Sequence, residues 1–206
     1  MGQAAEKSPH IGRATVAELE AVPPNLVAEL IGGTLYTMTR PAPKHGVAAS
    51  RLGGELQGPF DRGRGGPGGW WILDEPELRF ADPAAPGEVE VVVPDLAGWL
   101  RERMPKLPRT KYFTLAPDWI CEVLSPSTAA HDRGVKMPLY AREGVRLAWL
   151  IDPIARTLEI FNLGADGRWV VAEVHGGDAV VRAAPFDAIE LELAALWAEA
   201  EGDEDV

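Results

Sequence analysis

The sequence holds a single cysteine, Cys121, among its 206 residues. One cysteine can form neither an intrachain disulfide nor a cysteine-based zinc cluster, which excludes scaffolds that depend on them. Cys121 follows Ile120 in an apolar run, which predicts a packed strand residue, with a reactive thiol as the alternative. This cysteine content is compatible with a reducing compartment.

Long apolar runs are also missing. No stretch approaches the roughly 18 uninterrupted apolar residues of a membrane span, and the first residues, MGQAAEKSPHIGRA, lack the apolar centre of a secretory signal. We therefore expect a cytoplasmic protein. The length fits one domain over 1–206. Within it we expect an N-terminal extension over about 1–24, a core over 27–160, a C-terminal hairpin and short helix over 161–200, and an acidic tail over 201–206.

Positive charge is scarce, since the formal net charge is -11. This balance argues against wholesale electrostatic attachment to nucleic acid, which needs a positive field at the contact surface. The charge is unevenly placed, because residues 189–206 carry seven acids and no base. A local basic segment, RERMPKLPRTK, contains the candidate nucleic-acid-binding residues Arg101, Arg103, Lys106, Arg109 and Lys111.

The first two thirds of the chain combine helical spacing with β-prone runs. TVAELEAV (15–22) predicts a short helix, and the runs around Gly32-Gly33 in VAELIGGTLYTMT (27–39) predict a hairpin. KHGVAASRLGGELQGPF (44–60) predicts a helix that ends at Gly58-Pro59. The central strands are predicted by three runs, WWILDEPELRF (70–80), VEVVVPDLAGW (89–99) and DWICEVLS (118–125).

The remaining third continues this alternation. HDRGVKMPLYAREG (131–144) predicts a helix closed by Gly144, and VRLAWLIDP (145–153) predicts a buried strand. TLEIFNL and RWVVAEV, joined by GADG, predict a second hairpin, and LELAALWAEAE (191–201) predicts a short amphipathic helix. The expected fold class is therefore α/β (α+β), a central mixed sheet flanked by helices, with N-terminal and C-terminal β-hairpins.

Two acids stand at positions where a charge is costly. Asp95 ends a buried strand after Pro94, and Glu122 lies inside the apolar run WICEVLS. A carboxylate in such a place needs a partner, a hydrogen bond or a metal. Two carboxylates on neighbouring strands would form a hard-oxygen site for Mg²⁺ or Mn²⁺. The alternative is that both are exposed at strand ends, or paired with Arg133 or Lys136.

A lysine near such a metal site could orient water or stabilise charge on a phosphodiester. Residue 124, which would share the face of Glu122, is Leu124, so Lys136 on the following helix is the candidate. Asp132 and Tyr140 lie four residues to either side of it, on the same helical face. If Lys136 acts only in the transition state, Lys136→Ala should lower turnover about a hundredfold and change stability little. The alternative is a solvated surface lysine.

At these residues the sequence resembles a known family. The runs VVVPDL, PDWICEVLSPST and HDRGVKMPLYAREGVRLAWLIDP are similar to those of the Uma-type restriction endonuclease family, within the PD-(D/E)XK nuclease superfamily. The resemblance covers about 27–160. It implies a restriction-endonuclease-like core with Asp95 and Glu122 as metal-binding acids and Lys136 in place of the displaced motif lysine. It also points to Glu29 and His45, for which a structural role is the alternative.

These observations together favour a metal-dependent phosphodiesterase that acts on DNA, with water as the nucleophile and Mg²⁺ or Mn²⁺ as cofactor. The alternative is a catalytically silent module on the same fold that holds nucleic acid or a protein through the basic segment 101–111. A homodimer is a further expectation, because a double-strand cut needs two sites and apolar edge hairpins favour being covered.

Overall fold

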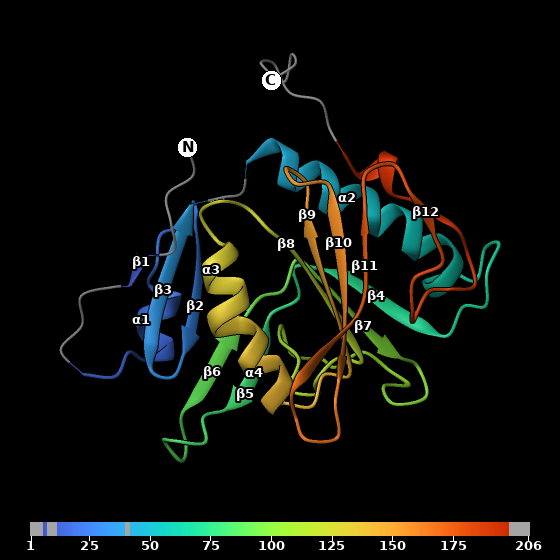
Figure 1. The fold of residues 1–206 in the computed structure, drawn as a ribbon. Coiled ribbons are helices and arrows are strands. Elements are labelled where there is room, and N and C mark those ends of the chain that lie inside the picture. Colours follow the sequence, from blue (N-terminus) through green and yellow to red (C-terminus); the bar gives the residue numbers. More distant parts are fainter. Residues whose placement is uncertain (1–5, 8–11, 40–41, 198–206) are drawn as a thin grey trace.

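The computed structural model describes residues 6–7, 12–39 and 42–197, which form two large sheets with helices packed against them (Figure 1). The first sheet is antiparallel, in the order β1-β3-β2-β6-β5. Its strands are β1 (Glu6–Lys7), β2 (Leu26–Ile31), β3 (Thr34–Thr39), β5 (Leu78–Ala81) and β6 (Val89–Val92). Helix α1 (Val16–Glu20), predicted from its sequence, contacts β2.

The predicted N-terminal hairpin is confirmed as β2 and β3. Gly32 and Gly33 form its turn with φ angles of 58° and 73°, a region that glycine adopts without the steric cost that other residues meet. Val27 lies directly opposite Met38 in this hairpin. Because side chains alternate along a strand, Val27 and Glu29 share one face of β2.

The second sheet has six strands in the order β11-β10-β9-β8-β7-β4. These are β4 (Trp70–Asp74), β7 (Leu96–Leu100), β8 (Trp119–Val123), β9 (Leu147–Asp152), β10 (Thr157–Leu163) and β11 (Trp169–Gly176). β8 and β9 are parallel and every other pair in this sheet is antiparallel. The predicted mixed αβ class, with a mixed sheet and a hairpin of β10 and β11, is therefore confirmed.

Two of the three predicted central strands are in fact pairs of strands. The run 89–99 divides into β6 and β7, which belong to different sheets. Pro94 lies at the break because it has no N–H for a strand ladder. The run 70–80 divides in the same way into β4 and β5, at Glu75, whose φ is 46°, and Pro76.

Helix α2 (Pro43–Leu56) packs on one face of the six-stranded sheet. It does not end at Gly58-Pro59 as predicted, but continues as a π-helical turn, η1 (Gln57–Asp61). The Arg62 N–H donates to the Gln57 carbonyl at 3.0 Å, a bond that spans five residues. The wider turn accommodates a proline that an α-helix would exclude.

The connection from β8 to β9 lies over the opposite face of that sheet (Figure 1). It consists of α3 (Ala129–His131), a π-helical turn η2 (Asp132–Lys136) and α4 (Met137–Arg142). Gly144, with φ 76°, follows the helix as predicted. Alternate residues of β8 face opposite sides of this sheet. Trp119, Cys121 and Val123 belong to the core beneath α2, whereas Ile120 belongs to the core beneath α4.

The C-terminal helix predicted over 191–201 is wrong for its described part. Leu191–Glu192 form β13, which pairs with β12 (Val180–Val181), and a 3-10 turn, η3 (Leu193–Leu196), follows. The Leu193 N–H donates to the Ala179 carbonyl, so tertiary pairing outweighs helical periodicity. Residues 198–201 lie outside the described residues. In the described residues no helix has the length and apolarity to cross a membrane.

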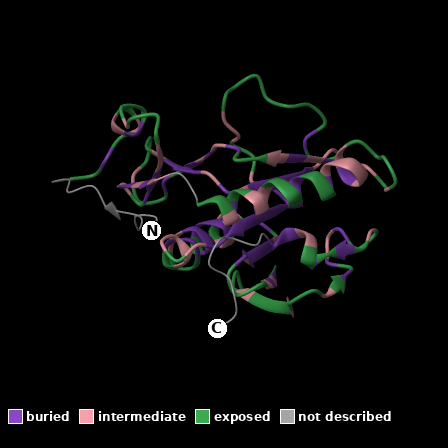
Figure 2. Cartoon of the chain, turned by 90° about the horizontal axis from the view of Figure 1, so that it is seen from above, coloured by how far each residue is buried: buried purple, intermediate pink, exposed green. Residues whose placement is uncertain are grey.

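Buried residues concentrate in the strands, and the outer sides of the helices are exposed (Figure 2). An aromatic cluster fills the core beneath α2. Phe186 is 2% exposed, and its ring centroid lies 4.7 to 5.6 Å from four other aromatic rings. These rings belong to Phe60, Trp70, Trp119 and Trp149. Cys121 is buried in the same core, as its apolar setting predicted.

We expect Phe186→Ala to lower the free energy of unfolding by about 3 to 5 kcal/mol, because it removes the shared neighbour of four rings and leaves a cavity. Urea unfolding would measure this loss. Ile154→Ala is the control, because Ile154 is 58% exposed, and it should change stability by less than about 0.5 kcal/mol. A loss below about 1 kcal/mol for Phe186→Ala would contradict this account of the core.

Candidate active site

Glu122 is a carboxylate buried inside a strand. It lies on β8 and is 1% exposed, facing the α3–α4 connection. Its Oε2 accepts from Nζ of Lys136 at 2.8 Å, and its Oε1 accepts from the hydroxyl of Tyr140 at 2.6 Å. Burial raises the pKa of Glu122, Asp132 and Asp95 raise it further, and Lys136 lowers it. Glu122 is therefore not exposed at a strand end. It is paired with Lys136, which is one of the alternatives that the sequence left open.

Lys136 is the centre of this network and is only 5% exposed. Its Nζ donates to Glu122 and, at 2.9 Å, to the Val93 carbonyl, and it lies 3.3 Å from Oε1 of Glu29 and 3.7 Å from Oδ1 of Asp132. Burial lowers the pKa of Lys136, but these carboxylates outweigh it and hold the pKa well above its usual value. Lys136 is therefore a fixed positive charge. Lys136 is therefore not a solvated surface lysine, and its burial leads us to expect that its removal lowers stability.

Glu29, on β2, reaches the same network from the five-stranded sheet. It is fully buried, accepts from the Val93 N–H at 3.0 Å and lies 2.7 Å from Nε2 of His131. Burial raises its pKa, but Lys136 and His131 outweigh this and leave the pKa below its usual value. His131 was not predicted. Its sequence signal is only its place beside Asp132 in the predicted helix, and it does not indicate a contact with a residue 102 positions earlier.

Asp95 follows the break between β6 and β7. Its Oδ2 accepts from the Val123 N–H at 2.6 Å, and its Oδ1 lies 3.2 Å from Nε2 of His45, in the first turn of α2. Burial lowers the pKa of His45, but Asp95 outweighs burial and raises the pKa above its usual value. The Nδ1 atom of His45 is buried and, in the described part of the chain, has no hydrogen-bond partner. Asp95 is thus anchored to both β8 and α2.

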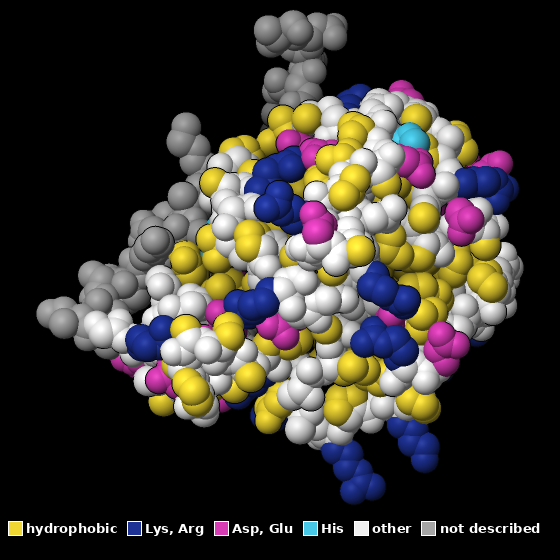
Figure 3. Space-filling view, turned by 60° about the horizontal axis from the view of Figure 1, so that its bottom comes forward, with side chains coloured by type: hydrophobic (Ala, Val, Ile, Leu, Met, Phe, Trp, Pro, Cys, Tyr) yellow, Lys and Arg dark blue, Asp and Glu magenta, His cyan; other side chains and the backbone are white. Residues whose placement is uncertain are grey.

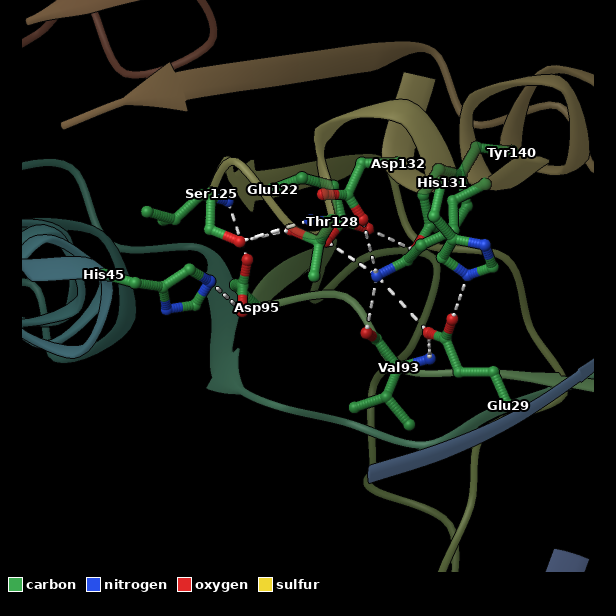
Figure 4. A network of polar contacts seen from close by, with 12 residues as sticks. Glu29, His45, Val93, Asp95, Glu122, Ser125, Thr128, His131, Asp132 and Tyr140 are labelled. Atoms are coloured by element: carbon green, nitrogen blue, oxygen red, sulfur yellow. Dashed lines mark hydrogen bonds and ion pairs between the residues drawn. The ribbon is translucent and has the colours of Figure 1, made fainter. Parts of the chain in front are cut away.

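A cavity of about 410 Å³ connects these groups (Figure 4). Six of the seven predicted catalytic candidates line it, namely Glu29, His45, Asp95, Glu122, Asp132 and Lys136. Tyr140 joins through its bond to Glu122. Ser125, Ser127 and Thr128 also line the cavity, and Ser125 Oγ lies 2.9 Å and 3.0 Å from the other two hydroxyl oxygens. The sequence SPST that contains these hydroxyls gives no signal of a site, because serine and threonine are common in turns.

The basic segment 101–111 is not at this cavity. It begins after the last residue of β7, whereas Asp95 precedes the first residue of that strand. Arg101 pairs with Asp61 and stacks 3.5 Å from the ring centroid of Trp71, and Arg103 pairs with Asp118 at 2.8 Å. On the face shown in Figure 3, basic side chains are interspersed with acidic and apolar ones. The structure therefore does not bring the segment to the carboxylates.

The carboxylates of the cavity are possible ligands of a divalent cation. Within the described ranges, no three or more His, Cys, Asp or Glu side chains are arranged to hold a metal ion. Mg²⁺, however, is usually held by one or two carboxylates and several waters. Five acidic side chains line this cavity together with the single ammonium of Lys136, namely Glu29, Glu75, Asp95, Glu122 and Asp132. This excess of negative charge and hard oxygen is compatible with a hydrated divalent cation rather than with a closed protein cage.

The chain is similar in sequence to known proteins. A model of the Uma2 family, described as "Putative restriction endonuclease", matches residues 15–195. A protein of Synechocystis sp. (strain ATCC 27184 / PCC 6803 / Kazusa), described as uncharacterized, is 31% identical over 75 residues, which span 36% of this chain and 40% of that protein.

A solved structure shares the fold. The crystal structure of "a putative nuclease belonging to DUF820" from Anabaena variabilis ATCC 29413 matches with a TM-score of 0.68 and 23% identity, over 89% of this chain and 97% of that chain. The similarity therefore shows a shared fold over most of the chain.

We expect Lys136→Met to lower the free energy of unfolding by about 3 kcal/mol or more near neutral pH, because it leaves buried carboxylates without their counter-charge. The loss should depend on pH. Without the ammonium, the pKa of Glu122, which burial already raises, rises further. A carboxyl with a raised pKa in the folded state stabilises the fold below its unfolded pKa and loses this contribution as pH rises through the folded pKa.

Urea unfolding at about pH 5 and about pH 8 would measure this effect, and the deficit of Lys136→Met should be larger at the higher pH. Arg182→Met is the matched control, because Arg182 forms an exposed ion pair with Glu190. Such a pair contributes at most about 1 kcal/mol. A deficit that is equal at both pH values would contradict the assignment of buried, uncompensated carboxylates.

Proposed function

Because this chain belongs to the Uma2 family, described as "Putative restriction endonuclease", we propose that it is a metal-dependent nuclease that hydrolyses phosphodiester bonds of DNA with water as the nucleophile. The observation that carries the proposal is the cavity, in which a buried ammonium and an excess of carboxylates meet. The chain has a single cysteine, which is buried, and this suits action in the reducing cytoplasm.

Asp95 and Glu122 would hold Mg²⁺ or Mn²⁺. When bound, such an ion neutralises charge on a phosphodiester and lowers the pKa of a coordinated water. Asp95 is the more accessible acid, with a side chain 16% exposed. The Val123 N–H and His45 fix its orientation. Tyr140 holds Glu122 through Oε1, the carboxylate oxygen that Lys136 does not bond.

Lys136 would stabilise the negative charge that develops on the phosphate. Its raised pKa excludes the role of a base, because the ammonium keeps its proton at physiological pH. Glu29 and the Val93 carbonyl hold Nζ in place, so no reorganisation is needed when charge develops. His131 in turn orients Glu29. Glu29 and His131 are thus positioning residues in this proposal.

A homodimer is part of the proposal, and β11 is the surface that supports it. This strand ends the six-stranded sheet, and Val170, Val171 and Val174 on it are each more than half exposed. An apolar edge strand of this kind favours pairing with another chain. Light scattering at micromolar concentration should show twice the mass of the chain, and Val171→Lys should shift the mass toward the monomer. A monomer in the wild type would contradict the proposal.

We expect Asp95→Asn and Glu122→Gln each to lower cleavage by a hundredfold or more, on the order of the loss of an electrostatic catalytic group. Each keeps the shape of the side chain and removes the charge that a cation needs. Plasmid and single-stranded DNA with Mg²⁺ or Mn²⁺ are the substrates, and EDTA should abolish cleavage. Glu190→Gln, an exposed acid outside the cavity, is the control and should cleave as the wild type does.

Two outcomes would contradict the proposal. Cleavage that survives Asp95→Asn in a folded protein would place the chemistry elsewhere. A wild type that cleaves neither DNA with either metal would favour the catalytically silent binding module. Urea unfolding of each variant separates loss of cleavage from loss of fold.

A further inference from the structure

The proposed catalytic groups lie at the bottom of the cavity. Glu122 is 1% exposed and Lys136 is 5% exposed, whereas Ala42 and Glu75, which also line the cavity, are exposed. A volume of about 410 Å³ is in the range of a small-molecule pocket and not of a groove that surrounds a helix. A duplex keeps its bases stacked behind its phosphates, so its backbone could not follow the cavity down to Glu122 without unpairing.

One part of the cavity is apolar. The cross-strand pair Val27 and Met38 of the β2–β3 hairpin lines it, together with Val93, Val123 and Pro126. Val27 shares its strand face with Glu29, so this apolar surface lies beside the charged groups. A nucleotide has the same division, a flat apolar base next to a charged phosphate. The lining therefore matches one unpaired nucleotide in both size and chemistry.

Charge also favours an unpaired strand. The protein carries a net charge of -11, and Arg101 and Arg103 are engaged by acids away from the cavity. A duplex presents a phosphate about every 1.7 Å of its axis, twice the density of one strand, and depends more strongly on cationic contacts. An acidic surface therefore repels a duplex more than it repels a single strand.

We propose that the substrate is single-stranded DNA, of which one unpaired nucleotide enters the cavity with its base against Val27 and Met38. This inference rests on the proposed function, because it assigns a substrate class to the same site. Because an unpaired strand can enter the cavity, a carboxylate as deeply buried as Glu122 can act on a phosphodiester. It also makes the β2–β3 hairpin the part of the fold that recognises the base.

The test measures binding without cleavage. Ca²⁺ takes the place of Mg²⁺ in this test. Fluorescence anisotropy with the full-length wild type would compare its binding to a labelled 20-nucleotide strand with its binding to the blunt duplex of the same sequence. We expect the single strand to bind at least tenfold more tightly. Thr39→Trp, which adds bulk to the cavity lining at the end of β3, should weaken single-strand binding at least tenfold. Thr34→Trp on the same strand, outside the lining, is the matched control and should bind as the wild type does.

Several results would overturn the inference: equal or tighter binding of the duplex, binding of neither, or single-strand binding that Thr39→Trp leaves unchanged. The proposed function fails separately. If the wild type binds the single strand as expected but cleaves no DNA with Mg²⁺ or Mn²⁺, the substrate class stands and the hydrolytic activity does not. If it cleaves plasmid and single strand at equal rates and binds the duplex as tightly, the activity stands and the substrate class does not.

Discussion

The ammonium of Lys136 links the two large sheets, which share no strand. It contacts Glu29 in the five-stranded sheet, Glu122 in the six-stranded sheet and the Val93 carbonyl at the junction between them. Each carboxylate alone would be costly to bury, and each is acceptable because the same cation faces both. The position of the hairpin relative to the central sheet, and so the shape of the cavity, depends on this shared charge.

The sequence indicates which residues form this cavity better than it indicates how deeply they are buried. Asp95 and Glu122 stand out because a charge in an apolar run needs a partner, and the spacing of Asp132, Lys136 and Tyr140 indicates a shared helical face. The sequence does not show whether that helical face points toward the core or toward solvent, so a solvated Lys136 was the alternative. His131 escaped prediction because its partner, Glu29, lies 102 residues earlier in the chain, on β2.

The strand runs show a similar limit. The continuous apolar run over 89–99 predicted one strand, and the structure has β structure there, but as two strands that Pro94 divides between two sheets. That division places Asp95 at the start of β7, next to the end of β8, and a continuous strand could not have done so. The C-terminal helix failed for a related reason. Leu191 and Leu193 fit helical spacing, yet pairing with distant residues decides their structure.

The π-helical turn Asp132–Lys136 has a consequence for how this site tolerates changes in chain length. In an α-helix, residues five positions apart point about 140° away from each other. Here His131 and Lys136 are five positions apart, yet both contact Glu29. The wider turn brings them to one side, as an inserted residue would. Deletion of one residue from this turn would restore a regular α-helix and keep Lys136 and Tyr140 on their present side, whereas a regular α-helix with the present number of residues would turn both about 100° away. The wide turn is therefore what lets this number of residues place His131, Lys136 and Tyr140 at the same site.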